Sequence, residues 1–154
     1  ADKVGFPQGG VFYKGSLYAS SAPDLLKFTD TDGDGVADKR EVLLSGWELN
    51  INANSLIGPF MAPDGWLYLT SAIEGFDIMT KEGEHLKGET ARVWRVMPDG
   101  SGLQWISAGG MNNPVGLTFT AASEVLGTQT YFTDPKAGQR RRVHFGRSQR
   151  GQAW

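Results

Sequence analysis

The stretch Ala62-Pro63-Asp64-Gly65-Trp66-Leu67-Tyr68-Leu69-Thr70 is a tight turn followed by a segment rich in aromatic and aliphatic residues. Pro-Asp-Gly is typical of a turn, and the residues after it favour a β-strand. An apolar segment at 56–62 precedes the turn, and the same order of strand, turn and strand recurs at 10–20 and 115–129. The sequence therefore predicts a hairpin that repeats along the chain.

A second pair of strands follows each of the first two hairpins. Residues 25–28 and 42–44 form the first pair, and residues 93–96 and 103–106 form the second. Four strands in about 40 to 55 residues is the size of one blade of a β-propeller. We therefore expect a chain built from four-stranded units.

These units predict an all-β fold, a partial β-propeller of about two and a half four-stranded blades. The blades cover 9–46, 55–109 and 114–135 or slightly beyond, within a propeller segment at 1–135. A closed propeller needs about four to eight blades, so we expect either a homo-oligomer or a segment of a longer chain. A small β-sandwich built from the same strands is the alternative architecture.

An acidic loop lies between the two strands of the first pair. Residues 30–41 read Asp-Thr-Asp-Gly-Asp-Gly-Val-Ala-Asp-Lys-Arg-Glu, which satisfies the calcium-loop pattern D-x-[DN]-x-[DN]-G-x5-E. Five carboxylates in twelve residues repel one another unless a cation lies between them. The predicted calcium ligands are the side chains of Asp30, Asp32, Asp34, Asp38 and Glu41, and the backbone carbonyl of Val36. A solvated acidic turn is the alternative.

The segments beside this loop are not those of an EF-hand. Pro23 leaves only six residues before the loop, too few for a stable helix. The residues after it, 41–46, are a short apolar run that ends at glycine and favours a strand. We therefore predict that calcium has a structural role, connecting two antiparallel strands.

The composition agrees with a turn-rich β protein. The chain has 21 Gly, 7 Pro, 8 Phe, 5 Trp and 4 Tyr in 154 residues. It has no Cys, which excludes disulfides, thiolate catalysis and cysteine-ligated zinc. No apolar run approaches the roughly 18 residues of a membrane-spanning helix. Because calcium loops are most often filled where calcium is abundant, the sequence favours an extracytoplasmic protein, periplasmic or secreted.

The charge is divided unevenly along the chain. Residues 1–134 contain all 17 acidic residues, whereas residues 135–154 contain six basic residues and no acidic one. A basic segment can bind nucleic acid, but this one accompanies no recognisable nucleic-acid-binding module. We therefore predict a disordered basic tail at 136–154 and no nucleic-acid partner.

Several phrases together resemble a known group of propellers. They are similar to the membrane-bound dehydrogenase propeller domains of planctomycete-type bacteria, distant relatives of sorbosone and soluble glucose dehydrogenases. The resemblance covers about residues 4–138. The phrases that carry it are Asp24-Leu25-Leu26 with the acidic loop, Ala62 to Tyr68, Val93 to Gly100, and Gly109 to Val115.

This resemblance implies a sugar or alcohol dehydrogenase that uses pyrroloquinoline quinone and a histidine base. Relatives often carry a histidine before the strand that precedes the Pro-Asp-Gly turn, but residues 50–55 here contain none. His85 and His144 are predicted to be surface residues. The sequence therefore identifies no catalytic residue, and the quinone is implied by the resemblance alone.

In a propeller, the connections between blades open on one face, and this predicts a substrate site for a hydroxyl-rich ligand such as a sugar. Its predicted residues, on connecting loops and on an insert at 73–90, are Asn50, Asn52, Asn54, Glu74, Asp77, Asn112 and Asn113. The acidic loop would lie on the opposite face. Turn-forming asparagines and a solvated acidic insert are the alternative interpretation.

Three functions follow from these observations. The first is a calcium-binding propeller segment of a sugar or alcohol dehydrogenase-like protein, with a quinone-dependent oxidoreductase activity if it is active. The second is a calcium-dependent hydrolase of the lactonase type. The third is a noncatalytic carbohydrate-binding or structural module. The sequence favours the first as ancestry and leaves the activity open.

Overall fold

The computed structural model describes residues 4–49, 55–107, 111, 113–130 and 143–148. All regular secondary structure among them is β, and the all-β prediction is confirmed. No helix of the described residues is long and apolar enough to cross a membrane. The strands are β1 Gly10–Tyr13, β2 Ser16–Ser21, β3 Asp24–Thr29, β4 Lys39–Ser45, β5 Leu56–Met61, β6 Leu67–Ser71, β7 Phe76–Met79, β8 His85–Gly88, β9 Arg92–Val96, β10 Gln104–Trp105, β11 Asn113–Phe119, β12 Val125–Thr130 and β13 Val143–Ser148.

The strands form three larger antiparallel sheets and one separate hairpin. The first sheet has the order β1-β2-β3-β4, so each strand pairs with its neighbour in the chain. The second sheet has the order β10-β9-β6-β5, and the two-stranded β7–β8 hairpin occupies the connection between β6 and β9. The third sheet has the order β11-β12-β13. None of these described sheets closes on itself into a barrel.

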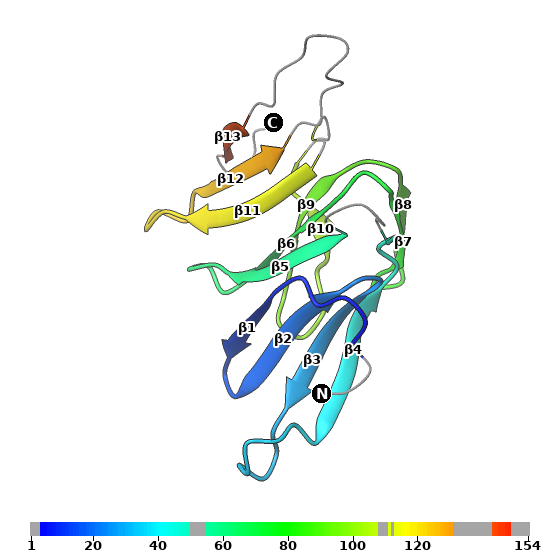
Figure 1. Ribbon diagram of the computed structural model, residues 1–154, viewed down its shortest axis with the longest axis vertical. Helices are drawn as coiled ribbons and strands as arrows, with labels where there is room; N and C mark the ends of the chain where they lie inside the picture. Colours follow the sequence, from blue (N-terminus) through cyan, green and yellow to red (C-terminus); the bar gives the residue numbers. More distant parts are fainter. Residues whose placement is uncertain (1–3, 50–54, 108–110, 112, 131–142, 149–154) are drawn as a thin grey trace.

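The three larger sheets follow one another along the long axis of the molecule (Figure 1). The main core includes residues of the first and second sheets, with Trp47 and Trp94 fully buried and their rings edge to face at 5.9 Å. A smaller core contains residues of the second and third sheets, where Tyr68 contacts Phe119 at 5.0 Å between ring centroids. Burial of these aromatic rings and of the aliphatic side chains around them stabilises the packing between sheets.

The strand predictions agree with the structure in the described regions. The hairpin turns form at the residues that favour them. In the turn between β5 and β6, Asp64 accepts a hydrogen bond from the Trp66 N–H at 3.1 Å, and Gly65 adopts a positive φ of 83°. Such a backbone conformation favours glycine. Local chemistry therefore determines these hairpins.

The insert at 73–90 differs from the open connecting loop that we expected. Most of it forms the β7–β8 hairpin, which begins beside the first sheet through an antiparallel bridge between Trp47 and Phe76. A Cβ at Gly46 would lie 2.0 Å from the Asp77 carbonyl oxygen, so the two backbones approach too closely for any other residue. The hairpin is thus packed against the end of β4 instead of forming a loose loop.

Part of the basic tail also has regular structure. Residues Val143–Ser148 form β13, which pairs with β12 from Val125↔Ser148 to Thr130↔Val143. The composition predicted a disordered terminus and gave no indication of this strand. The rest of the tail lies outside the described residues.

Candidate metal centre

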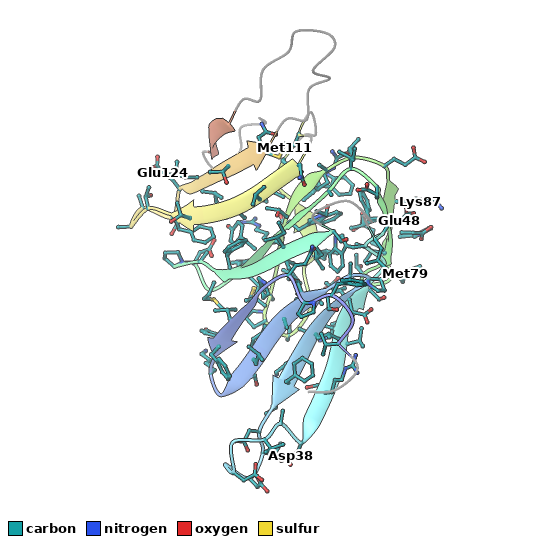
Figure 2. The ribbon with its side chains drawn as sticks, in the orientation of Figure 1. Asp38, Glu48, Met79, Lys87, Met111 and Glu124 are labelled. Atoms are coloured by element: carbon teal, nitrogen blue, oxygen red, sulfur yellow. The ribbon has the colours of Figure 1, made fainter. Side chains whose placement is uncertain are left out.

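The acidic loop joins β3 to β4 at the extreme end of the molecule. Figure 2 shows Asp38 there, far from Met111 and Glu124, which lie just before strands β11 and β12 of the third sheet. Thr29 at the end of β3 pairs with Lys39 at the start of β4. The Asp38 N–H donates a hydrogen bond to the Thr29 carbonyl oxygen at 3.0 Å. A regular antiparallel pair therefore fixes both ends of the loop.

Backbone donors inside the loop orient Asp30. Its carboxylate accepts hydrogen bonds from the N–H groups of Gly33 at 2.6 Å and Gly35 at 2.9 Å. Both glycines have positive φ, 82° and 90°, which turns their N–H groups inward. The N–H groups of Gly35 and then Gly33 lower the pKa of Asp30, because they stabilise the ionised carboxylate.

Asp38 is held in a similar way from the other end of the loop. Its Oδ2 accepts hydrogen bonds from the N–H and the hydroxyl of Thr31, each at 2.8 Å. These bonds lower the pKa of Asp38, with the backbone N–H of Thr31 making the largest contribution. Both carboxylates are therefore anionic and oriented at neutral pH.

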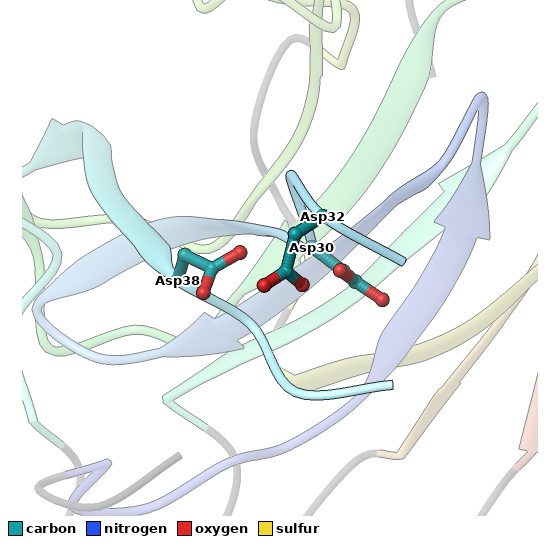
Figure 3. Close-up of side chains that lie close together, drawn as sticks. All are labelled: Asp30, Asp32 and Asp38. Atoms are coloured by element: carbon teal, nitrogen blue, oxygen red, sulfur yellow. The ribbon is translucent and has the colours of Figure 1, made fainter. Parts of the chain in front are cut away.

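Three carboxylates converge in this loop. One oxygen from each of Asp30, Asp32 and Asp38 lies within 4.8 Å of the other two (Figure 3). Calcium binds oxygens at about 2.3–2.6 Å, so oxygens with this spacing could all contact one ion. The arrangement could hold a hard divalent cation.

The side chains of Asp34 and Glu41 lie outside this group of three. Asp34 Oδ1 accepts a hydrogen bond from the N–H of Val36 at 2.7 Å. Glu41 lies on β4 opposite Lys27, and its Oε1 forms an ion pair with Lys39 at 3.0 Å. The hydrogen bond from Lys39 lowers the pKa of Glu41. As ligands, these three residues remain predictions.

The predicted substrate residues are not brought together by the described part of the chain. Asn50, Asn52, Asn54 and Asn112 lie outside the described residues. Asn113 is buried at the start of β11, and Glu74 is partly buried with its Oε2 enclosed and without a hydrogen-bond partner. Their role in binding a substrate stays a prediction.

Asp77 lies on the exposed side of the β7–β8 hairpin. It contacts His85 Nε2 at 2.7 Å and Lys87 Nζ at 2.6 Å. The hydrogen bond from Lys87, followed by that from His85, lowers the pKa of Asp77. In this arrangement the carboxylate is engaged by two neighbours of its own hairpin.

Comparison with known protein families assigns the chain to a family. Residues 1–145 match the family described as Domain of unknown function (DUF7133). The chain belongs to the DUF7133 family. No curated protein matches it.

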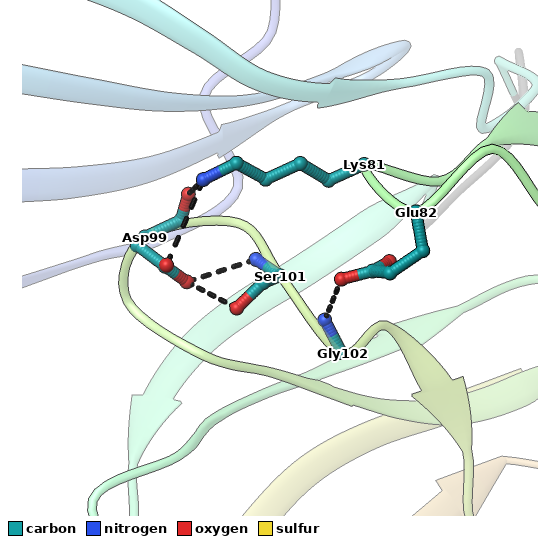
Figure 4. Close-up of polar contacts among 5 residues, drawn as sticks. All are labelled: Lys81, Glu82, Asp99, Ser101 and Gly102. Carbon is teal, nitrogen blue, oxygen red and sulfur yellow. Dashed lines mark hydrogen bonds and ion pairs between the residues drawn. The ribbon is translucent and has the colours of Figure 1, made fainter.

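In this DUF7133 domain, one polar cluster was not predicted from the sequence. At the tip of the hairpin insert, Lys81 Nζ lies 3.6 Å from Asp99 Oδ2, and Glu82 accepts the Gly102 N–H at 2.8 Å (Figure 4). The tip of the insert therefore contacts the β9–β10 turn, at the opposite end of β9 from where the insert begins. Each half of the cluster looks like an ordinary turn in the sequence, so no local signal indicates the contact.

A small cavity lies between the second and third sheets of the domain. It measures about 10 Å³ and is lined mainly by Val93, Met111, Pro114 and Leu117. This volume is enough for about one water molecule and far too small for a sugar. Among the described residues, the acidic loop is therefore the better candidate for a functional site.

Proposed function

We propose that this chain is a calcium-binding β-propeller segment of a sugar or alcohol dehydrogenase-like protein, in which calcium is structural. The observation that carries the proposal is the match of residues 30–41 to the calcium-loop pattern, together with the convergence of Asp30, Asp32 and Asp38. The resemblance described above supports the dehydrogenase ancestry.

The chemistry of the donor set supports calcium as the cation. All the predicted ligands are oxygens, which Ca²⁺ prefers, and the chain has no cysteine. The two glycines of the loop let backbone N–H groups fix Asp30. When bound, the ion would neutralise the repulsion among the three carboxylates and stabilise the connection between β3 and β4. Calcium binding would therefore stabilise the folded state.

The way the sheets pack supports the propeller part of the proposal. Each of the first two sheets is a four-stranded antiparallel meander in which strands two and three are adjacent, as in a propeller blade. Their β3–β4 and β9–β10 turns are equivalent by strand order. A Cβ at Gly100, in the β9–β10 turn, would lie 3.3 Å from the carbonyl oxygen of Leu43 in β4, so this turn packs on the outermost strand of the first sheet.

The test of the calcium site is a titration of the metal-free protein with calcium by isothermal calorimetry. We expect one site with a dissociation constant of about 10⁻⁴ to 10⁻³ M, the range of extracellular modules. The Asp32→Asn variant should bind more weakly because it removes one converging charge. Glu84→Gln is the matched control, since Glu84 is an exposed carboxylate of the β7–β8 turn, outside the acidic loop.

The result that would contradict the calcium proposal is an absence of binding heat and of any calcium-dependent stabilisation in the unmodified chain. The dehydrogenase part is tested separately, by adding pyrroloquinoline quinone and an electron-accepting dye with a panel of sugars and alcohols. Oxidation of a sugar would support it. Lactone hydrolysis without dye reduction would favour the hydrolase instead.

A further inference from the structure

The three larger sheets share a repeat in their second strands. These strands are β2, β6 and β12. We align them by the turn that precedes each strand and by the side of the sheet on which each residue packs. Three sets of residues correspond: Leu17 with Leu67 and Val125, Tyr18 with Tyr68 and Leu126, and Ala19 with Leu69 and Gly127. The same pattern is therefore present in all three sheets.

The first and third sets of positions, which lie on the same side of each strand, face the preceding sheet. Leu67 and Leu69 are fully buried in the core that contains first-sheet residues. Val125 is buried in the core that contains second-sheet residues. The corresponding residues of the first sheet, Leu17 and Ala19, belong to a separate apolar cluster on the outward face of that sheet.

This outward face is only partly covered. Val4 packs against the apolar cluster, but Phe12 and Val42 are 78% and 54% exposed. Phe12 of β1 pairs in register with Leu17 of β2, and Val42 of β4 pairs with Leu26 of β3. Both exposed side chains therefore lie on the same face as the cluster. Large exposed apolar side chains that extend a buried cluster are typical of a contact surface.

The second set of positions faces the following sheet. Tyr18 belongs to the core shared with the second sheet, and Tyr68 contacts Phe119 of the third sheet. Leu126 is the corresponding residue of the third sheet. It is partly exposed and pairs in register with exposed Thr118. Among the described residues, no further sheet packs on this side.

The two end faces therefore correspond to the two sides of the sheet contacts already present in the molecule. We propose that the outward face of the first sheet binds a second copy of this chain, through the Leu126 face of that copy's third sheet. The contact is head to tail, because it uses a different face on each copy. It repeats the packing of the second sheet on the first and of the third on the second, and it does not depend on the acidic loop.

The test is the molar mass of the chain by sedimentation velocity and light scattering, in calcium and in chelator. We expect the unmodified chain to exceed the monomer mass both in calcium and in chelator. Phe12→Asp and Leu126→Asp should each reduce it to a monomer, because each blocks one end. A mixture of the two variants should form a 1:1 dimer, because each retains one intact end. Met79→Asp, at an exposed position of the β7–β8 hairpin, is the matched control and should associate normally.

Three results would overturn the proposal: a monomeric unmodified chain at every concentration, a mixture of variants that stays monomeric, or loss of association from only one of the two variants. The last would indicate a symmetric contact between identical faces. Circular dichroism checks that each variant is folded. If Leu126→Asp is unfolded, Thr118→Asp replaces it, because Thr118 lies on the same face and is exposed.

Discussion

The substitution Asp30→Asn tests the proposed calcium site in the acidic loop most directly. Asp30 occupies the first position of the loop, and its carboxylate is oriented by the N–H groups of Gly33 and Gly35. Asparagine keeps the size of the side chain but has a single acceptor oxygen, so it removes the negative charge and one of these two hydrogen bonds. Because the loop is exposed, we expect weaker calcium binding with only a small loss of stability in the metal-free protein.

The magnitude follows from linkage between binding and folding. Calcium at 100 times its dissociation constant stabilises a protein that binds it only when folded by about 2.7 kcal/mol. For a chain of this size, that corresponds to a rise in melting temperature of about 5–11 °C. If the variant binds about 100-fold more weakly, the stabilisation at the same calcium concentration falls to about 0.4 kcal/mol.

The assay is a thermal melt by calorimetry, in chelator and at a calcium concentration set by the titration of the unmodified chain. The unmodified protein and Glu84→Gln should both melt about 5–11 °C higher in calcium, whereas Asp30→Asn should shift by only about 1–2 °C. Equal calcium-dependent shifts in Asp30→Asn and the unmodified protein would refute the reasoning. So would a large loss of stability of the variant in chelator, since the effect would then come from the loop's own hydrogen bonds.

Three further predictions follow from the contacts described above. Glu41→Ala should weaken calcium binding only slightly in calorimetry, because Glu41 is paired with Lys39, and should leave the melting temperature in chelator almost unchanged, because that ion pair is solvent-exposed and such pairs contribute little. Trp94→Ala should destabilise the fold by about 3–5 kcal/mol in urea denaturation, because Trp94 is fully buried and contacts three other aromatic rings. Asp77→Asn should lower the melting temperature at pH 7 but not at pH values below the folded pKa of Asp77. Its pKa is lowered in the folded state, mainly by Lys87, so its stabilisation is present above the ordinary value of 3.8 and is lost as the pH falls through the folded pKa. Melts from pH 7 downwards would contradict this if the difference persisted in acid.

The hairpins could be predicted because their information is local. Turn residues such as Gly65 adopt the backbone conformation that their position requires, and the strands beside them alternate between core and solvent. The β7–β8 hairpin also carries a local signal, since Phe76 and Ile78 are buried while Asp77 and Met79 are exposed. Its position could not be predicted. It depends on the close approach of Gly46 to the Asp77 carbonyl and on contacts with Asp99 and Gly102. These partners lie outside the hairpin in the sequence, before and after it.

The candidate site shows the same division between local and long-range information. The pattern predicted a set of calcium ligands, and the side chains of three of them, Asp30, Asp32 and Asp38, lie close together. Short-range hydrogen bonds within the loop determine the positions of Asp30 and Asp38. The pattern could not indicate where Glu41 points. Strand pairing with β3 sets that direction, and it places Glu41 opposite Lys27.

The position of Glu41 determines how tightly this loop should bind. In an EF-hand the twelfth residue of the loop supplies two oxygens to the ion. Here Glu41 lies two residues after Lys39, the first residue of β4. Each residue of a strand advances about 3.3 Å, so the backbone of Glu41 is about 7 Å further along the strand than that of Lys39. Its side chain forms an ion pair with Lys39. A site that relies on Asp30, Asp32 and Asp38 alone leaves several coordination positions to water, and weak binding in the range of extracellular modules follows. Sub-micromolar binding would instead require Glu41 to leave Lys39 for the ion. Comparing the affinities of the unmodified chain and Glu41→Ala decides between the two arrangements, because only the tight one loses affinity steeply.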